Sequence, residues 1–273
     1  MACPAGPWEP LAVQTGSVID ALRRGEPCVF RQRAAHWPAV AQWSWERLEA
    51  LAPDLPVRLV QGNRELDATV FQASTLGAYL RSLHGPATPG AAPLYLKEFD
   101  LLGTFAALRA DVRPQELFPP GALHDAQTWI GPAGARTGLH HDYLDNLAVQ
   151  LVGRKRFYLL RPGVVERLGA VAAKHDRWAA LASLNADAVA ERGVAVGDAW
   201  MVDLEPGDVI YVPARWWHEV ANHTSSVLLS GFFGPRTVVY AQWAWRQAVH
   251  GAHLAGLWRR GDCTCHPKRV NAC

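Results

Sequence analysis

A histidine and an aspartate stand two residues apart in the segment from Gly138 to Asp142. In an extended strand, residues i and i+2 point to the same side, so His140 and Asp142 can reach one metal ion together. On its own a His-X-Asp sequence is a weak signal, because it occurs by chance and equally suits a polar surface turn. Its meaning depends on whether a further ligand approaches the same face.

A third candidate ligand, His218, follows a segment rich in aromatic and β-branched residues. If residues 216–222 form a strand, one largely apolar face carries Trp216, His218, Val220 and Asn222. A single histidine in such a place is usually a core residue whose hydrogen bonds are satisfied. The histidine becomes informative only in combination with the first pair.

Two histidines and one carboxylate on one side of a metal are the facial triad of non-haem iron(II) oxygenases. Such a triad leaves coordination positions open for a bidentate cosubstrate and dioxygen, whereas zinc is more often held tetrahedrally. The sequence therefore predicts an iron(II) centre in which His140, Asp142 and His218 are both the metal ligands and the catalytic residues.

A lysine follows on an apolar strand face. Alternation in residues 154–159 places Lys155 on the same side as Phe157 and Leu159. Burying a lysine without an anionic partner is unfavourable. That partner is either a structural Asp or Glu or the carboxylate of a small acid. Thr137, which precedes the first histidine, adds a hydroxyl donor for the same carboxylate.

The elements that must position these residues are short strands. Strand-like segments occur at residues 27–30, 94–96, 128–130, 146–160 (two strands joined near Gly153), 208–212, 216–222 and 226–233. Strands at this spacing favour a barrel or a sandwich. Helices are predicted from Ser17 and over residues 74–84, where the apolar spacing is helical and Ser74 or Thr75 serves as the N-cap.

No clear linker divides the chain, so we expect a single domain over residues 1–273. Its parts are an N-terminal α/β annex, a barrel core at about 94–235 with a helical insertion over 163–200, and a helical C-terminal extension over 236–273.

The composition is that of an ordinary folded protein, with 49% hydrophobic and 19% charged residues and a net charge of +2 over 273 residues. The near-neutral charge argues against nucleic acid as a partner. No signal-like N-terminus and no long apolar run is present, so we expect no membrane contact and a cytoplasmic location. The twelve tryptophans indicate a large aromatic core, a buried contact surface, or both.

The C-terminal segment has the composition of a zinc cluster, with Cys263, Cys265, His266 and Cys273. The paired spacing usual for zinc ligands is absent. We therefore interpret the segment as a terminal tail rather than as a structural zinc site.

Taken in order, the motifs resemble those of the JmjC-domain 2-oxoglutarate oxygenases. The matching segments are residues 26–31, 37–43, 137–142, 145–147, 150–156 and 207–218, and the resemblance covers about residues 18–240. It is nearest to the small protein-hydroxylase branch, which includes the asparaginyl hydroxylase that inhibits hypoxia-inducible factor and the tRNA-wybutosine hydroxylase.

The resemblance implies a mainly β fold, the double-stranded β-helix of cupins and jelly rolls, with Fe(II) as cofactor and 2-oxoglutarate as cosubstrate. It implies that Lys155 and Thr137 bind the distal carboxylate of 2-oxoglutarate, that Tyr95 touches that carboxylate, and that Asn146 lies near the cosubstrate. A homodimer through the C-terminal helices is also implied. Many relatives carry an asparagine where Gly231 precedes two phenylalanines, so we expect a hydrogen bond near the oxygen site to be missing.

The function that the resemblance favours is hydroxylation of a protein or peptide side chain, with release of succinate and carbon dioxide. Three alternatives stay open. They are hydroxylation of a small molecule or natural-product intermediate, Nε-methyl-lysine demethylation, and metal binding by a cupin module without turnover. Lys155 argues against the last alternative, because a site for metal alone does not need a buried cation placed to meet a diacid.

Overall fold

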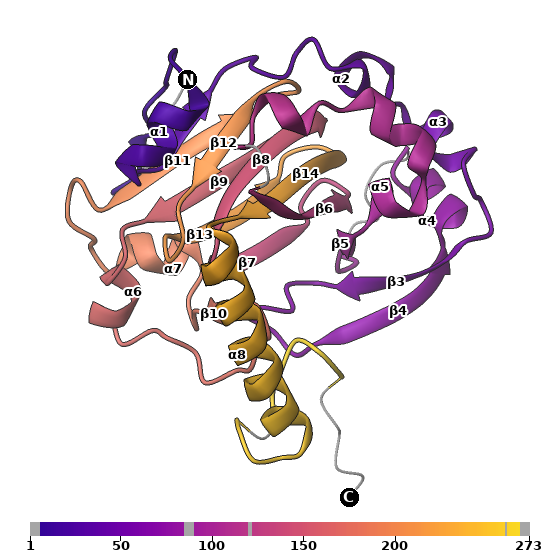
Figure 1. Cartoon of the computed structure of the whole chain (residues 1–273). Helices are drawn as coiled ribbons and strands as arrows, with labels where there is room; N and C mark the ends of the chain where they lie inside the picture. Colours follow the sequence, from indigo (N-terminus) through magenta and orange to yellow (C-terminus); the bar gives the residue numbers. More distant parts are fainter. Residues whose placement is uncertain (1–5, 85–89, 120–121, 260, 268–273) are drawn as a thin grey trace, which may run out of the picture.

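Two β-sheets form the body of the molecule (Figure 1). The computed structural model describes residues 6–84, 90–119, 122–259 and 261–267. The six-stranded sheet has the order β1 (Glu9–Pro10), β11 (Ala199–Leu204), β9 (Lys155–Leu160), β13 (Trp217–Asn222), β7 (Arg136–Asp142) and β10 (Ala179–Leu181). The eight-stranded sheet has the order β2 (Cys28–Phe30), β12 (Val209–Val212), β8 (Asp145–Val152), β14 (Ser226–Phe233), β6 (Leu123–Gly131), β5 (Leu94–Phe99), β3 (Pro56–Gln61) and β4 (Val70–Thr75).

The sheets have the topology of a jelly roll, as the sequence predicts. Consecutive strands alternate between the sheets: β7 and β9 lie in the first, while β8 lies in the second between β12 and β14. Their pairings are antiparallel. The residues before the predicted core also contribute strands, because β1 joins the first sheet and β2, β3 and β4 join the second. The sheets are thus wider than a core that begins at residue 94.

The helices are short apart from the last one. They are α1 (Val18–Arg24), α2 (Pro38–Gln42), α3 (Trp45–Glu49), α4 (Leu76–Ser82), α5 (Leu101–Thr104), α6 (Val164–Arg167), α7 (Ala186–Glu191) and α8 (Arg236–Leu254), with 3₁₀ turns at Ala106–Asp111 and Pro114–Glu116. Helix α4 confirms the prediction for residues 74–84. Its N-cap is Thr75, whose hydroxyl accepts a hydrogen bond from the Ala78 amide at 3.3 Å.

The predicted helical insertion within residues 163–200 is present as α6 and α7, but the chain between these two helices is not helical. Between α6 and α7 the chain forms β10, which pairs with β7 at the edge of the first sheet. The side chain of Asp176 sets up this strand, because its Oδ1 accepts hydrogen bonds from the amides of Trp178 and Ala179 at 2.7 and 2.8 Å. Such turns are decided by one polar side chain and leave little trace in hydrophobic periodicity.

The C-terminal extension is helical only as far as Leu254, so the prediction of a helical extension to residue 273 is wrong for the described residues after α8. Gly256, with φ of 72°, closes the helix. The amide of Gly256 donates to the His253 carbonyl, and the amide of Leu257 donates to the Ala252 carbonyl. This pairing is the Schellman motif, for which a glycine in the left-handed region is best suited. Residues 268–273 of the predicted extension lie outside the described residues.

The tryptophans divide between core and surface. Trp37 and Trp217 are almost completely buried. In contrast, Trp243, Trp245 and Trp258 are about half exposed, on α8 or just after it. Within the part of the chain that the structure describes, no helix is long and apolar enough to cross a bilayer.

Candidate metal centre

The strands that carry the three predicted ligands, β7 and β13, are neighbours in the first sheet. His140 and His218 are cross-strand partners, and their ring centroids lie 4.2 Å apart. Asp142 Oδ2 lies 3.5 Å from His218 Nε2. Candidate ligand atoms of all three residues lie within 4.8 Å of one another. The fold thus brings together side chains separated by about eighty positions in the sequence, at a spacing that suits a single metal ion.

The backbone fixes the orientation of both imidazole rings. His140 Nδ1 lies 2.7 Å from the Gly138 carbonyl oxygen, and His218 Nδ1 lies 3.0 Å from the Trp216 carbonyl oxygen. Since a carbonyl only accepts, each Nδ1 carries the proton and each Nε2 keeps a free lone pair. Burial lowers the pKa of His218 well below its ordinary value. Burial also raises the pKa of Asp142 to about 6, and a bound cation would stabilise the charged form of that carboxylate.

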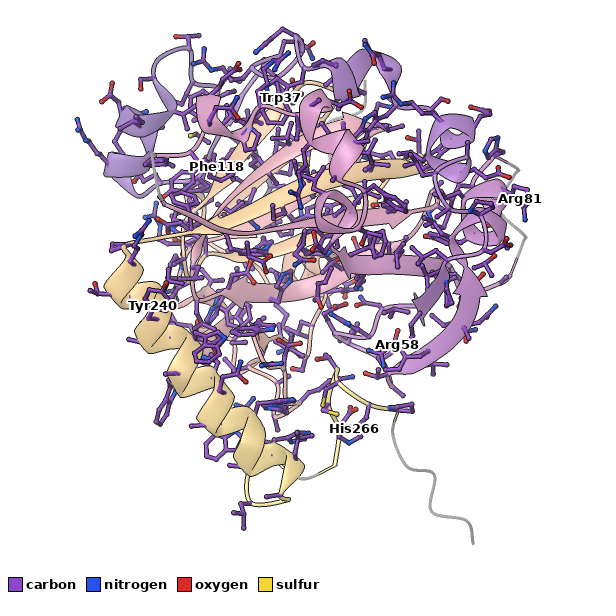
Figure 2. All side chains as sticks on the ribbon, turned by 45° about the vertical axis from the view of Figure 1, so that its right-hand side comes forward. Trp37, Arg58, Arg81, Phe118, Tyr240 and His266 are labelled. Atoms are coloured by element: carbon purple, nitrogen blue, oxygen red, sulfur yellow. The ribbon has the colours of Figure 1, made fainter. Side chains whose placement is uncertain are left out.

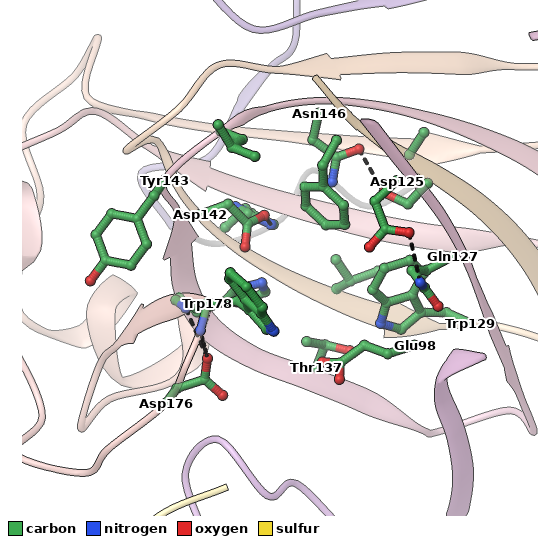
Figure 3. A pocket seen from close by; sticks show the side chains of 18 of the residues that line it. Glu98, Asp125, Gln127, Trp129, Thr137, Asp142, Tyr143, Asn146, Asp176 and Trp178 are labelled. Carbon is green, nitrogen blue, oxygen red and sulfur yellow. Dashed lines mark hydrogen bonds and ion pairs between the residues drawn. The ribbon is translucent and has the colours of Figure 1, made fainter. Parts of the chain in front are cut away.

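The candidate ligands line a cavity of about 540 Å³ between the two sheets (Figure 3). Large apolar side chains form part of its lining, namely Trp129, Phe157, Leu181, Leu228 and Phe232. Carboxylates and amides also reach it, namely Glu98, Asp125, Gln127, Asp176 and Gln242. The cavity has the size range and the mixed lining typical of sites for small organic molecules.

A buried cation lies directly behind one wall of this cavity. Lys155 is fully buried, and its Nζ donates hydrogen bonds to the Tyr95 hydroxyl at 2.7 Å and to Asn222 Oδ1 at 2.6 Å. Tyr95 lines the cavity, whereas Lys155 does not touch it directly. Both hydrogen-bond partners of the ammonium group are neutral. Burial therefore lowers the pKa of Lys155 well below its ordinary value, with no carboxylate among the described residues to offset this.

The hydroxyl of Thr137 is a second polar group that faces the cavity without a settled partner. It is buried next to the Tyr95 hydroxyl, but it makes no hydrogen bond of normal geometry with the described residues. A buried hydroxyl left unpaired costs about 1–3 kcal/mol. One carboxylate bound at Thr137 and Tyr95 would satisfy the Thr137 hydroxyl and offset the charge of Lys155, which lies one hydrogen bond behind Tyr95. These residues therefore fit the distal carboxylate of 2-oxoglutarate.

Asn146, which lies on β8, is next to the candidate metal ligands. Its Oδ1 accepts a hydrogen bond from Ser230 Oγ at 2.6 Å, and its side chain lies close enough to Asp142 to favour the charged form of that carboxylate. On β14 the cavity is lined by Leu228, Ser230 and Phe232, so alternation turns Gly231 away from it. The expectation that Gly231 leaves a hydrogen-bonding position empty is therefore wrong. Ser230 provides a polar side chain on that strand.

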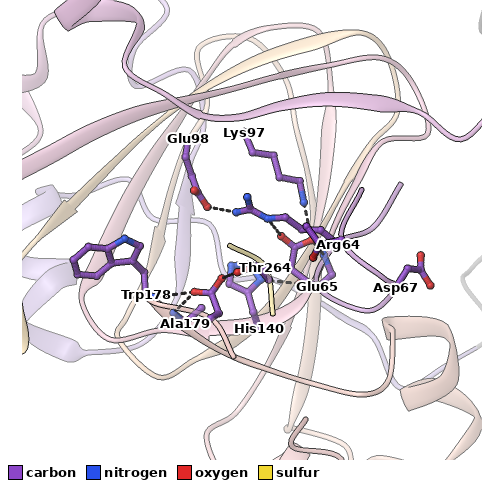
Figure 4. A network of polar contacts seen from close by, with 12 residues as sticks. Arg64, Glu65, Asp67, Lys97, Glu98, His140, Trp178, Ala179 and Thr264 are labelled. Atoms are coloured by element: carbon purple, nitrogen blue, oxygen red, sulfur yellow. Dashed lines mark hydrogen bonds and ion pairs between the residues drawn. The ribbon is translucent and has the colours of Figure 1, made fainter. Parts of the chain in front are cut away.

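An ion-pair network forms part of the cavity wall next to the candidate site (Figure 4). Glu65 is buried, with Lys97 Nζ at 2.6 Å from one carboxylate oxygen and Arg64 Nε at 3.2 Å from the other. Arg64 also pairs with Glu98. Burial alone would raise the pKa of Glu65, but Lys97 and Arg64 outweigh this effect and hold it at about 2. Lys97 thus has its own acid, in contrast to Lys155.

Two parts of the site were not predicted as such from the sequence. Asn222 contacts Lys155, and its place on the same strand face as His218 was the available signal. Asp176 and Trp178 line the cavity from the insertion. They lie more than thirty residues in sequence from β7 and β13, the strands that carry the candidate ligands, so no local pattern points to them.

A model of the cupin-like domain family matches residues 19–243. Lysine-specific demethylase JMJ30 of Arabidopsis thaliana is 29% identical over 220 residues, which cover 79% of this chain and 51% of that protein. The tRNA wybutosine-synthesizing protein 5 of Gallus gallus is 31% identical over 134 residues, which cover 49% of this chain and 41% of that protein.

The bifunctional peptidase and (3S)-lysyl hydroxylase JMJD7 of Homo sapiens is 24% identical over 243 residues, which cover 76% of this chain and 77% of that protein. The chain spans about half the length of several of the curated relatives it matches. The similarity to the wybutosine protein agrees with the resemblance seen in the motifs.

Proposed function

This chain belongs to the cupin-like domain family of JmjC-type oxygenases, and on that premise we propose that it is an iron(II)- and 2-oxoglutarate-dependent hydroxylase of a protein or peptide side chain. His140, Asp142 and His218 would hold the iron. Thr137, Tyr95 and Lys155 would hold the far carboxylate of 2-oxoglutarate.

The observation that carries the proposal is the buried ammonium group of Lys155. It lies one hydrogen bond from the cavity and has only neutral partners among the described residues. A metal site without a diacid would leave this desolvated cation and the Thr137 hydroxyl unexplained. A carboxylate bound at this point would form charge-assisted hydrogen bonds away from water, where such bonds are strong.

When bound, iron(II) would supply the activation of dioxygen that couples oxidation of 2-oxoglutarate to succinate and carbon dioxide with hydroxylation of the substrate. The residues of the chain would orient the reactants. The Nδ1 protons of His140 and His218, held by backbone carbonyls, keep Nε2 available as ligand atoms. Asn146 would hold the Asp142 carboxylate in place, and the apolar lining would limit access of water.

The part of the cavity lining that lies outside the proposed iron and 2-oxoglutarate sites suits a basic or neutral polar side chain of the substrate. Glu98, Asp125 and Asp176 bring three carboxylates to the cavity wall against two arginines, Arg64 and Arg246, and Arg64 is already paired with Glu98. The relatives named for lysine demethylation and for lysyl hydroxylation support a protein substrate. A protein or peptide side chain inserted into the cavity is therefore the substrate class that we favour.

The test is release of succinate from 2-oxoglutarate by the iron(II)-loaded protein, combined with a mass-spectrometric search for +16 Da products in peptide libraries and lysate. His140→Ala and His218→Ala should lose iron and reduce succinate formation to background. His223→Ala is the matched control, because this histidine lies just after β13, is partly exposed and should leave both readouts unchanged.

Normal turnover by either ligand variant would show that the ligand assignment is wrong. Tight iron binding without detectable binding or turnover of 2-oxoglutarate would favour a metal-binding module instead. Formaldehyde in place of a stable +16 Da product would indicate demethylation.

A further inference from the structure

A second group of metal-ligating side chains lies at the C-terminal end of the described chain, outside the cavity. His253 from the last turn of α8 meets Cys263, Cys265 and His266, and the candidate ligand atoms all lie within 4.8 Å of one another. Figure 2 shows His266 close to the sulfur atoms at this end of the molecule. His253 and Cys263 are buried, while Cys265 and His266 are half-buried.

The spacing of these atoms is close to that of a filled tetrahedral site. His266 Nδ1 lies 3.2 Å from Cys263 Sγ and 3.1 Å from Cys265 Sγ. The two sulfur atoms are 3.1 Å apart, and Cys265 Sγ is 3.5 Å from His253 Nε2. Ligands at zinc–nitrogen and zinc–sulfur bond lengths lie about 3.3–3.8 Å from one another in a tetrahedron. We propose that His253, Cys263, Cys265 and His266 bind one zinc ion.

The chemistry of the donors favours zinc over the metal of the cavity. Two thiolates and two imidazoles form a closed set of soft and borderline ligands, which is the composition of structural zinc sites. The candidate iron site has a carboxylate in place of thiolates and opens into a cavity. The two centres therefore differ in metal preference and in access to small molecules.

The backbone holds His253 in the orientation that a ligand requires. Its Nδ1 lies 3.2 Å from the carbonyl oxygens of both Trp258 and Arg259. The proton is therefore on Nδ1, and Nε2 faces Cys265 with its lone pair. The Schellman motif that ends α8 turns the chain back and brings these two carbonyls to the ring.

The segment that carries the other ligands is fixed independently to the barrel. Cys263 pairs with His175 in a short parallel bridge, and the Cys263 carbonyl accepts a hydrogen bond from Thr69 Oγ1 at 2.6 Å. The His175 ring also stacks on the His253 ring with centroids 4.0 Å apart. The described segment 261–267 is thus a packed part of the fold and not a free tail.

The zinc site would be connected to the wall of the cavity. Thr264, between the two cysteines, donates a hydrogen bond from its hydroxyl to Asp176. Asp176 lines the cavity and organises the start of β10, where Ala179 pairs with Asp142 of β7. We therefore expect zinc to act as a clasp that keeps the end of α8 and the segment 174–181 in place. It would not take part in the reaction.

The experiment measures zinc and iron per chain by mass spectrometry of protein purified without a metal-binding tag. The wild type should hold about one zinc ion per chain after dialysis against a mild chelator. His253→Ala and the double variant Cys263→Ser/Cys265→Ser should lose at least about nine-tenths of it, as expected when ligands are removed. His250→Ala and Cys28→Ser should retain it, since these residues lie outside the ligand set. His140→Ala should lose iron and retain zinc.

Hydrogen exchange provides a readout of the clasp. Amides of residues 174–181 should exchange faster in the zinc-free variants than in the wild type. If these variants fail to fold, two measurements on the wild type take their place. One is the release of zinc by a mercurial reagent. The other is the uptake of cobalt(II), detected by the absorption band of cobalt–thiolate bonds. A wild type that holds no zinc after growth in zinc and takes up cobalt without thiolate absorption would overturn the proposal. So would equal zinc content in the wild type and the double cysteine variant.

Discussion

At the scale of single residues, the two buried lysines show what distinguishes a structural cation from one that can bind a ligand. Lys97 has a carboxylate at 2.6 Å from its Nζ, supplied by Glu65. Lys155 is equally buried, but among the residues that the structure describes its Nζ hydrogen-bonds only to a phenol and an amide. Removing a cation from water is costly unless an anion compensates. The burial of Lys155 is therefore best explained by an anionic ligand that binds reversibly.

We predict that Lys155→Met weakens binding of 2-oxoglutarate by about 10- to 100-fold, the range expected for loss of one or more hydrogen bonds to a charged group. Iron binding should be unchanged, because the metal ligands are not touched. Calorimetric titration of 2-oxoglutarate into the manganese-loaded protein measures the affinity.

Arg154→Ala is the matched control for this substitution, because it removes the adjacent cation from an exposed position. Its affinity for 2-oxoglutarate should match that of the wild type. Equal loss of affinity in both variants would mean that the general charge of this strand, and not the buried ammonium group, attracts the diacid.

At the scale of elements, strand parity made much of the candidate site predictable. Alternation correctly predicted that Lys155 shares its buried face with Phe157 and Leu159. It also predicted a common face for Trp216, His218, Val220 and Asn222, and Trp216 and Val220 do pack in the same core cluster while His218 and Val220 line the same cavity. The strand boundaries around Gly153 were also predictable, because the glycine adopts the positive φ of 71° that the turn between β8 and β9 requires.

The remainder of the site depends on contacts between segments that are distant in sequence. Strand β10 exists because it completes the edge of β7 and because Asp176 caps the turn before it, and neither cause is visible in local hydrophobic periodicity. For the same reason, the proposed zinc site at the C-terminus could not be predicted from local sequence. The spacing of Cys263, Cys265 and His266 is unusual for zinc, and the fourth candidate ligand, His253, lies in the last turn of α8, before the chain turns back.

The Glu65 ion pairs connect the loop after β3 to β5 and β7. Lys97 lies on β5, and the amide of Gly138 on β7 lies 3.3 Å from Glu65 Oε2. We predict that Glu65→Gln reduces the free energy of unfolding at neutral pH by about 3 kcal/mol, because it leaves the buried Lys97 without its carboxylate and removes one of the two carboxylates that pair with Arg64. Chemical denaturation followed by fluorescence measures the change.

The pH dependence of this difference has a definite sign. The pKa of Glu65 is about 2 in the folded protein and 4.5 when unperturbed, so its stabilisation is complete above about pH 4.5 and is lost as the pH falls towards 2. The gap between wild type and Glu65→Gln should therefore shrink over that range. A gap that stays constant down to the acid limit of folding would mean that the carboxylate charge is not responsible. Glu46→Gln, at an exposed position, is the control and should have little effect on stability.

At the scale of the whole molecule, α8 stands out because it projects from the barrel, as Figure 1 shows, and carries exposed apolar side chains. Tyr240 is 66% exposed, Trp243 54% and Leu254 65%. At 100° per residue, these three side chains lie within about 60° of one another around the helix axis. These exposed apolar side chains form a stripe that Gln247 and Gly251 interrupt, and large exposed apolar groups of this kind mark contact surfaces.

We propose that a second copy of the chain covers this stripe, with α8 of each protomer packed against the other in a twofold dimer. Light scattering after size exclusion should then give twice the chain mass of 29.9 kDa. Tyr240→Glu/Leu254→Glu would bury charge in the contact and should weaken association at least about 100-fold.

Val196→Glu is the control. It alters an 88% exposed apolar residue in the α7–β11 connection and should leave the dimer intact. A wild type that stays monomeric at all concentrations would refute the proposed dimer, and the stripe would then be open to the substrate protein that approaches the cavity beside Trp243.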